Sequence, residues 1–399
     1  MRIAFVADDL YPGYGGQAAA TEGHIGALLA LGHEVRVLAG NEVSPTMPPN
    51  GVAIERLPVW RPGEKQTHLA FPDAGKIKAL LDWAEVVQIN TPTPLALRTL
   101  HLARREGVPS VMGFHTQEES ATLHFRLLRP LVRAALRVWY GYLYQRPDCL
   151  VAPTDFAARL ARRYTRRPIF VVSNGIHLPA HGTAEDERAA SMRRRLLSGR
   201  RYLLSYMGRL THEKRPEDLL VIFSELRRLR KDVRLAVAGT GPLRKALERQ
   251  AARLGLADEV RFLGYVSGNE KQDLLAASDL FLMPSPTELQ SIATLEAMAQ
   301  GCAVAAAEVE TSAVGELVQM SDCGICYRPG SLEEAAAEIS RLLGRPDELQ
   351  RLKRNAERAA CGHDVRESGR GLQEIYQNLS GFRSGDVGRT GEPLERMEL

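Results

Sequence analysis

The sequence predicts an α/β protein built from two doubly wound domains that face each other across a cleft. Three observations support this fold class. Short apolar runs typical of buried strands recur along the chain, helical spans separate them, and the same alternation begins again in the second half. The length of 399 residues suits two domains, because compact units commonly hold about 100–200 residues.

The first forty residues set the pattern. Arg2–Ala7 has the continuous apolar character of a buried strand, and a Gly-rich turn follows it. A helical pattern through Ile25 and Leu28 then ends at Gly32, which is a typical helix stop. Val35–Ala39 is the next strand. This strand–helix–strand order predicts a right-handed crossover in a parallel sheet.

The later strands divide into two series. They are predicted at Val86–Asn90, Ser110–Phe114, Cys149–Ala152 and Ile169–Ser173, and then in the runs that begin at Tyr202, Val233, Val260, Asp279, Cys302 and Cys323. The charged stretch Ala180–Arg195 lies between the series and is expected to connect the domains. We therefore assign residues 1–180 to an N-terminal domain and 196–364 to a C-terminal domain. A helix at 365–381 is a candidate to cross back to the first domain, and 382–399 is expected to be a mobile tail.

Composition indicates the compartment. Five cysteines in a chain of this size are typical of a reducing environment, and the Cys323–Cys326 pair has no second pair to complete a zinc site. The N-terminus reaches an acidic residue at Asp8, too early for a signal peptide, and no apolar run is long enough to span a bilayer. We expect a cytoplasmic protein.

Ligands of doubly wound sheets bind at the carboxyl ends of the strands. Arg209 and Lys214 follow the first strand of the second half, where a guanidinium fork and an ammonium group together suit a diphosphate. The alternative is a solvated pair of surface residues.

Two Gly-rich turns precede helices. Gly15 and Gly16 would let backbone N–H groups approach an anion at a helix N-terminus, although a plain turn would also use glycine. Gly239 and Gly241 read as a tight turn, because Arg244 stands where the dinucleotide-binding fingerprint needs a third glycine. The missing third glycine argues against binding of a nicotinamide cofactor.

The stretch Ser285–Gly301 carries two carboxylates, Glu288 and Glu296, at either side of a helix start near Leu289–Ser291. The first N–H groups of such a helix, up to Ile292, suit a phosphate or sugar oxygen, and a carboxylate accepts hydrogen bonds from the paired hydroxyls of a ribose or hexose. This combination predicts a nucleotide sugar as ligand. The alternative is that Glu288 only favours the helix N-terminus and that Glu296 meets a basic partner elsewhere.

These residues, taken together, resemble the retaining glycosyltransferases of family 4, which have the GT-B fold of two Rossmann-like domains. The most specific element is the E-x7-E motif, matched by Glu288 and Glu296 in PTELQSIATLEAMAQG. Around it, in the family's order, stand GHEVRVLAG, VVSNGIHL, YMGRLTHEKRPEDLL, VRFLGYVS and DLFLMPS. The resemblance covers nearly the whole chain. It implies an N-terminal domain that binds the acceptor and a C-terminal domain that binds the nucleotide sugar.

The resemblance also implies residue roles. Catalytic roles fall to Glu288 at the transferred sugar, His115 near the donor sugar, and Arg209 and Lys214 at the diphosphate. Donor binding involves the same Glu288, Arg209 and Lys214, Glu296 at the ribose, the Gly15–Gly16 backbone, the base-binding loop at Gly264 and Val266, and the helix start at Gln290, Ser291 and Ile292. Many relatives have Phe-Gly where this chain has Gln290-Ser291, a departure that bears on sugar specificity.

The implied activity is hexosyl transfer with retention, from a nucleoside-diphosphate sugar to a hydroxyl of a lipid or glycan, without a metal or other cofactor. Uridine diphosphate–glucose is the favoured donor type, and GDP-mannose is the second candidate. A GT-B nucleotide-sugar epimerase and a non-catalytic nucleotide-sugar binder stay open as alternatives. Nucleic acid is not expected as a partner, because no reading module is present.

The span 124–147 is the best indication of an acceptor surface. Ten arginines lie between residues 121 and 170, against only Asp148 and Asp155. Leucines alternate with arginines here and aromatic residues follow, as in helices that lie on anionic membranes. An anionic membrane surface is thus a candidate partner, and a peripheral position on the inner face of the membrane a candidate location. The alternative is a helix whose apolar side packs on the N-terminal domain while its arginines are solvated.

Overall fold

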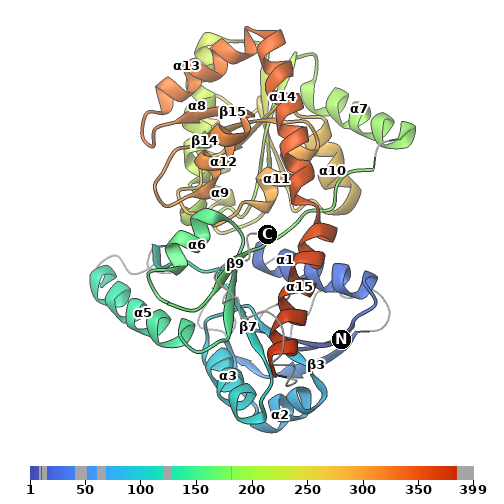
Figure 1. Ribbon diagram of the computed structural model, residues 1–399. Coiled ribbons are helices and arrows are strands. Elements are labelled where there is room, and N and C mark those ends of the chain that lie inside the picture. Colours follow the sequence, from blue (N-terminus) through green and yellow to red (C-terminus); the bar gives the residue numbers. More distant parts are fainter. Residues whose placement is uncertain are drawn as a thin grey trace. The chain divides into compact units, whose positions relative to one another are not determined.

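The computed structural model describes residues 1–8, 10, 16–40, 52–60, 69–119, 128–180 and 182–383. The chain divides into two units (Figure 1). The first comprises Met1–Gly175 together with the segment that starts at Val365, and the second comprises Ile176–Asp364. Each unit has its own parallel sheet.

The sheet of the first unit has the strand order β3-β2-β1-β6-β7-β8-β9, and every neighbouring pair is parallel. Its strands are β1 (Arg2–Ala7), β2 (Glu34–Gly40), β3 (Ala53–Leu57), β6 (Val86–Ile89), β7 (Ser110–Gly113), β8 (Cys149–Ala152) and β9 (Ile169–Val171). Phe5 pairs with Val37 on one side and Gln88 on the other, and its side chain is fully buried. The buried apolar strands need cover on both faces, which the helices supply.

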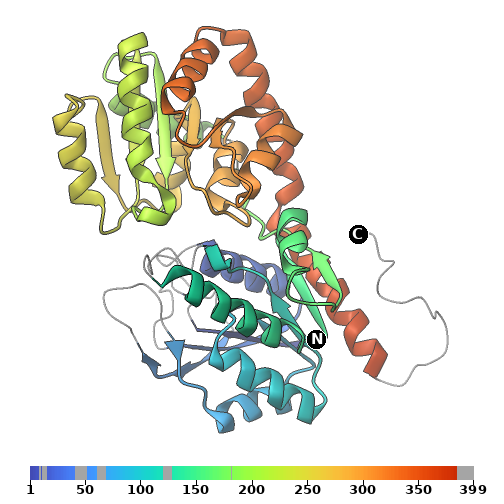
Figure 2. The same ribbon diagram turned by 90° about the vertical axis from the view of Figure 1, so that its left-hand side faces the viewer.

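The helices of this unit are α1 (Gly16–Ala30), α2 (Ala74–Trp83), α3 (Pro94–Glu106), α5 (Arg129–Tyr144), α6 (Asp155–Ala161) and α15 (Val365–Arg383). The last helix of the chain, α15, lies beside the first, α1 (Figures 1 and 2). The two come so close that a Cβ atom on Gly369 would lie 2.6 Å from Cβ of Ala27. Tyr376 of α15 is fully buried, and its hydroxyl donates to Gln88 Oε1 at 3.1 Å.

The sheet of the second unit has the order β12-β11-β10-β13-β14-β15, again all parallel, which is the doubly wound order with its reversal between β10 and β13. The strands are β10 (Tyr202–Met207), β11 (Val233–Ala238), β12 (Val260–Gly264), β13 (Leu280–Met283), β14 (Ala303–Ala307) and β15 (Gly324–Tyr327). The helices are α7 (Thr183–Leu197), α8 (Pro216–Leu229), α9 (Arg244–Arg253), α10 (Gly268–Ala276), α11 (Ile292–Ala299), α12 (Ala313–Ser321), α13 (Leu332–Leu343) and α14 (Pro346–Ala360). Figures 1 and 2 show α8 and α13 side by side.

The predicted fold class is confirmed, and the predicted strands lie where their apolar runs placed them. The structure adds β3 at one edge of the first sheet and a small antiparallel pair, β4 (Val59–Trp60) with β5 (Leu69–Ala70). Only Leu57 of β3 is fully buried, because an edge strand is covered on fewer sides. No continuous apolar run therefore marked it.

The stretch Ala180–Arg195 differs from its prediction as a connection. Most of it belongs to α7, which lies in the second unit and buries Met192 and Leu196 against Leu203 and Ala236. Most of the other residues of α7 are polar or charged, so the composition of the segment does not indicate the few apolar residues that are buried. The boundary between the units falls earlier, between Gly175 and Ile176.

Candidate active site

The loop after β10 in the second unit carries both predicted diphosphate ligands. A short 3-10 helix, His212–Lys214, follows Arg209, and the Arg209 guanidinium contacts the buried carboxylate of Glu213. Lys214 Nζ donates to Glu288 Oε1 at 2.6 Å, and the two side chains are only 20% and 11% exposed. Lys214 is therefore not a solvated surface lysine. The fold joins it to the first glutamate of the E-x7-E motif.

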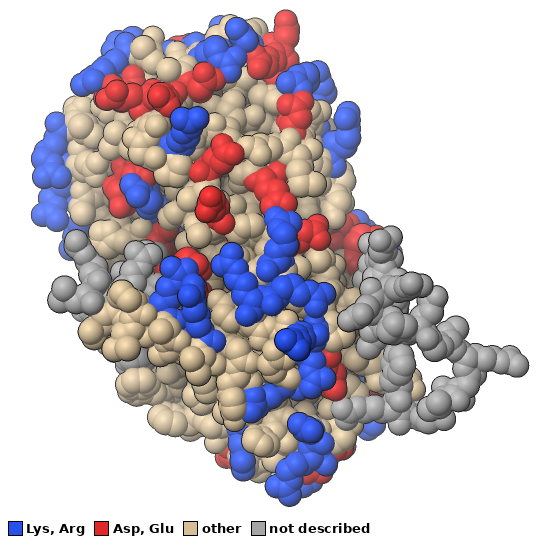
Figure 3. All heavy atoms as spheres, turned by 60° about the vertical axis from the view of Figure 1, so that its left-hand side comes forward, with Lys and Arg blue, Asp and Glu red and all other residues tan. Residues whose placement is uncertain are grey.

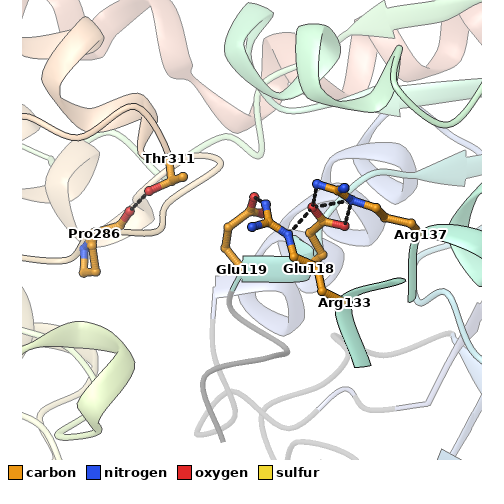
Figure 4. A network of polar contacts seen from close by, with 6 residues as sticks. All are labelled: Glu118, Glu119, Arg133, Arg137, Pro286 and Thr311. Carbon is orange, nitrogen blue, oxygen red and sulfur yellow. Dashed lines mark hydrogen bonds and ion pairs between the residues drawn. The ribbon is translucent and has the colours of Figure 1, made fainter. Parts of the chain in front are cut away.

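The loop that bears Glu288 is held in place from its other side as well. The main-chain N–H of Ala313 donates to the Glu288 carbonyl oxygen at 2.8 Å. Two residues before Glu288, the Pro286 carbonyl oxygen accepts from Thr311 Oγ1 at 2.6 Å (Figure 4). These contacts fix the backbone at Glu288 while Lys214 fixes its carboxylate.

Helix α11 begins close to the predicted position. Ser291 is its N-cap, and Ser291 Oγ accepts from the N–H of Thr294 at 3.2 Å. The first-turn N–H groups, starting with Ile292, have no acceptor within the helix. Gln290 and Ser291 are both buried, so the departure from Phe-Gly lies in a packed part of the loop.

Glu296 lies on α11 and has a basic partner that sequence reasoning did not identify. Lys271 of α10 donates through Nζ to Glu296 Oε1, with side chains 31% and 20% exposed. The two residues come from different helices at a separation that follows no helical period, so no local pattern pointed to this contact. Glu296 thus has a basic partner, Lys271, and its role in binding a ligand stays a prediction.

The glycine turn after β11 supports the Arg209 loop. A Cβ atom on Gly239 would lie 1.8 Å from the Gly208 carbonyl oxygen, and one on Gly241 would lie 2.4 Å from that of Leu210. Only glycine permits this approach, which confirms the prediction of a tight turn. Gly239 also donates its N–H to the carbonyl oxygen of Gly264 at 2.6 Å. This hydrogen bond connects the glycine turn to the loop that leads to the buried Val266.

In the first unit, His115 follows β7 and its ring folds back over Gly113, where a Cβ atom would lie 2.4 Å from His115 Nε2. Burial lowers the pKa of His115 to about 3, helped by the nearby His24. His24 on α1 is itself buried, with Nε2 3.2 Å from the Ser173 carbonyl oxygen, and burial lowers its pKa to about 4. Both imidazoles are therefore neutral at physiological pH. Gly16 is the first residue of α1, and Gly15 lies outside the described residues.

The predicted basic helix has an unexpected orientation. Arg133 Nε and Arg137 Nε donate to Glu118 at 2.7 and 2.9 Å, and Arg133 Nη2 donates to Glu119 at 2.7 Å (Figure 4). The Glu118 side chain is only 1% exposed. Burial by itself would raise the pKa of Glu118, but the hydrogen bonds from Arg137 and Arg133 outweigh burial and hold it below the usual value.

As a result, the alternative of a helix whose arginines are only solvated is wrong for two of them, and the membrane contact stays a prediction. Arg133 and Arg137 bind Glu118, and Arg133 also binds Glu119, although the two arginine side chains are still 35% and 56% exposed. Two apolar residues of α5 are exposed, Leu131 at 68% and Val138 at 75%, whereas Leu143 and Tyr144 at the end of the helix are fully buried. Residues 124–127 of the predicted segment lie outside the described part of the chain.

Within the described ranges, no group of three or more His, Cys, Asp or Glu side chains is placed to hold a metal ion. No helix of the same ranges is long and apolar enough to cross a lipid bilayer.

Two models of known protein families together match nearly the whole chain. The family model described as Glycosyltransferase Family 4 matches residues 14–179, and the model described as Glycosyl transferases group 1 matches residues 187–359. The first match falls almost entirely in the first unit, and the second falls within the second unit.

Curated relatives carry glycosyltransferase names. An alpha-D-kanosaminyltransferase of Streptomyces kanamyceticus is 27% identical over 70% of this chain and 72% of its own. A GDP-mannose-dependent alpha-(1-6)-phosphatidylinositol dimannoside mannosyltransferase of Mycobacterium tuberculosis is 28% identical over 88% of this chain and 90% of its own. Among solved structures, Anabaena Alr3699/HepE in complex with UDP and glucose has a TM-score of 0.77 at 20% identity, covering 95% of this chain and all of that one.

Proposed function

Because this chain belongs to the GT-B glycosyltransferases, we propose that it moves a hexose from a nucleoside-diphosphate sugar to a hydroxyl of a lipid or glycan, with retention and without a metal. A UDP-glucose-type donor is the first candidate and GDP-mannose the second. The Anabaena neighbour was solved with UDP and glucose, and the mycobacterial relative is named as GDP-mannose-dependent, so each donor has support.

The observation that carries the proposal is the contact of Lys214 with Glu288, which joins the loop after β10 to the loop after β13; Arg209 lies in the same β10 loop and contacts Glu213. Departure of a nucleoside diphosphate builds negative charge on the leaving oxygens. Preorganised cations at that place stabilise the transition state without reorganisation during the reaction. Lys214 already holds Glu288, so a donor bound there would find its diphosphate cation and its sugar-binding carboxylate joined.

The start of α11 would serve the same donor. Its first N–H groups, at Ile292 and onwards, and the positive end of the helix dipole favour a phosphate oxygen. Glu296, on the next turn of the helix, would accept the ribose hydroxyls, and the loop of Gly264 and Val266 would hold the base. Gly15 and Gly16 would contribute backbone N–H groups to phosphate or acceptor.

His115 would act as a neutral hydrogen-bonding partner of the transferred sugar. A pKa of about 3 leaves the imidazole uncharged over the working range of pH, so it would not serve as a cation for the leaving group. That function belongs to Arg209 and Lys214, whose charges make metal-independent transfer feasible.

Retention in this proposal follows a front-face path. Glu288 is engaged by Lys214, and an ammonium group on a carboxylate oxygen reduces its capacity as a nucleophile. The departing phosphate would instead assist deprotonation of the acceptor hydroxyl. Glu288 then binds and orients the sugar and forms no covalent bond with it.

The acceptor side of the proposal is a lipid at a membrane surface. The name of the mycobacterial relative specifies a phosphatidylinositol dimannoside, and α5 presents the exposed apolar residues Leu131 and Val138. The segment after α6 carries exposed arginines, and it lies against the C-terminal end of α5. There Arg167 Nε donates to the carbonyl oxygen of Gln145 at 2.9 Å. Figure 3, turned towards this side, shows many Lys and Arg side chains. We propose a cytoplasmic enzyme that attaches peripherally to the inner face of the membrane.

Turnover of UDP-glucose and GDP-mannose in EDTA, with and without phosphatidylinositol vesicles, tests the proposal. Release of the nucleoside diphosphate is measured, and NMR identifies the anomer of any glycoside formed. We expect one donor to be consumed and an α-linked product to form, because both donors are α-linked. Lys214→Met should lower kcat by about a hundredfold or more, whereas Lys353→Met, on the distant Asp279 pair, should not.

A β-linked product would contradict retention, and turnover only with added Mg²⁺ would contradict metal independence. If neither donor is consumed, even by slow hydrolysis without acceptor, the proposed donor class is wrong.

A further inference from the structure

Lys271 stands outside every motif that the sequence suggested, yet it contacts the second glutamate of E-x7-E. Its Nζ donates to Glu296 Oε1. Elsewhere in the described residues the Glu296 carboxylate has no other hydrogen bond, so Oε2 and the remaining lone pair of Oε1 are available to a ligand. The arrangement repeats that at Glu288, whose Oε1 is held by Lys214.

The position of Lys271 in the chain connects it to a second part of the predicted donor site. Helix α10 starts at Gly268, directly after its N-cap Ser267 and the loop of Gly264 and Val266. Lys271 lies in the first turn of that helix. One short segment thus joins the loop proposed for the base to the cation on the carboxylate proposed for the ribose.

A ribose places a particular demand on such a carboxylate. It offers two neighbouring hydroxyls, and the carboxylate must present its oxygens to both of them at once. The terminal torsion of a glutamate side chain has a broad energy profile, so the plane of the carboxylate is poorly defined without a partner. A lysine fixed on one oxygen removes that freedom and leaves charge-assisted acceptors pointing elsewhere.

We infer that Lys271 is a positioning residue for nucleotide recognition, which holds the Glu296 carboxylate in the orientation that accepts both ribose hydroxyls. This inference rests on the proposed function. A purely structural ion pair would behave differently. Both side chains are partly exposed, so the pair contributes little to folding, and its loss should change stability slightly and nucleotide binding not at all.

Calorimetric dissociation constants test the inference. They are measured for whichever of UDP, GDP and ADP the wild type binds, and for the 2′-deoxy and 3′-deoxy forms of that nucleotide. Lys271→Met should weaken binding of the ribonucleotide about tenfold, the size expected for a hydrogen bond to a charged group. The deoxy forms should lose less, so the preference for ribose over deoxyribose should shrink.

The controls separate positioning from general damage. Lys271→Arg keeps the cation and should restore most of the affinity and of the ribose preference. Lys353→Met removes a comparable partly buried lysine, which lies 3.6 Å from Asp279, and should bind nucleotides as the wild type does. In turnover, Lys271→Met should raise KM for the donor about tenfold and change kcat less than twofold.

Two results would overturn the inference. One is wild-type affinity and ribose preference in Lys271→Met. The other is an equal loss for the ribonucleotide and both deoxy forms, which would place the lysine's effect on the diphosphate or on folding. Failure of the proposed function has a different signature: the wild type would bind none of the three nucleotides, or Glu296→Ala would bind them unchanged.

Discussion

At the scale of single residues, the nearly inaccessible carboxylate of Glu118 accepts hydrogen bonds from two arginines of α5 that the sequence placed on an outer basic face. Both arginine side chains remain partly exposed. A buried carboxylate needs such partners, because an unpaired charge in the interior is costly. Two positive charges of the helix are therefore paired with acidic side chains of the first unit.

The neighbouring histidines lead to a prediction about acid stability. The pKa of His24 is about 4 in the folded protein and near 6.5 when unfolded, so the unfolded state binds more protons between these values. Stability is therefore lost as pH falls below about 6.5. At pH 5 the expected contribution of His24 is a loss of about 2 kcal/mol in the free energy of unfolding.

Urea unfolding at pH 7.5 and pH 5.0 measures this effect. His24→Gln keeps an amide near the position of Nε2 and should lose about 2 kcal/mol less than the wild type between the two pH values. His101→Gln, at an exposed position of α3, should lose as much as the wild type. Identical pH dependence in His24→Gln and the wild type would show that His24 is not the buried neutral group described here.

At the scale of elements, the strands were predictable and some contacts between elements were not. A buried parallel strand needs a continuous apolar run, so runs such as Arg2–Ala7 and Cys149–Ala152 located their strands to the residue. The edge strand β3 lacks such a run. The Lys214–Glu288 pair joined two residues that were already candidates, whereas Lys271 reaches Glu296 from another helix and left no local signal.

The exposed apolar face of α5 gives a prediction for membrane binding. Leu131→Glu/Val138→Glu should reduce binding to anionic vesicles at least tenfold, because each side chain loses the burial that a bilayer interface offers. The melting temperature of this double variant should stay near that of the wild type, since both substituted residues are exposed. Co-sedimentation with phosphatidylglycerol-containing vesicles measures the difference.

Met320→Glu is the matched control, because Met320 is an exposed apolar residue of α12 in the second unit. It should bind vesicles as the wild type does. Equal binding by the double variant, or an absence of binding by the wild type, would remove α5 as a membrane contact.

At the scale of the whole molecule, each unit has candidate site residues directly after strands of its own sheet. His115 follows β7 in the first unit, and the loops after β10 and β13 carry Lys214 and Glu288 in the second. The helix start at Ser291 and the tight turn at Gly239 could be predicted because each depends on a local backbone requirement. The partners of Glu118 and Glu296 could not, because they depend on tertiary packing.

The central claim is that the second unit binds a nucleotide sugar through Glu288, Glu296 and their lysines. Thermal unfolding with UDP, GDP, ADP, NAD and the common sugar conjugates tests it most directly, on the wild type and Glu296→Ala. A ligand that binds only the folded state raises the melting temperature, with about 2.7 kcal/mol of stabilisation at a hundred times its Kd. We predict a shift with one nucleoside diphosphate and its sugars that is lost in Glu296→Ala. A shift with NAD alone, or one that Glu296→Ala leaves unchanged, would contradict the claim.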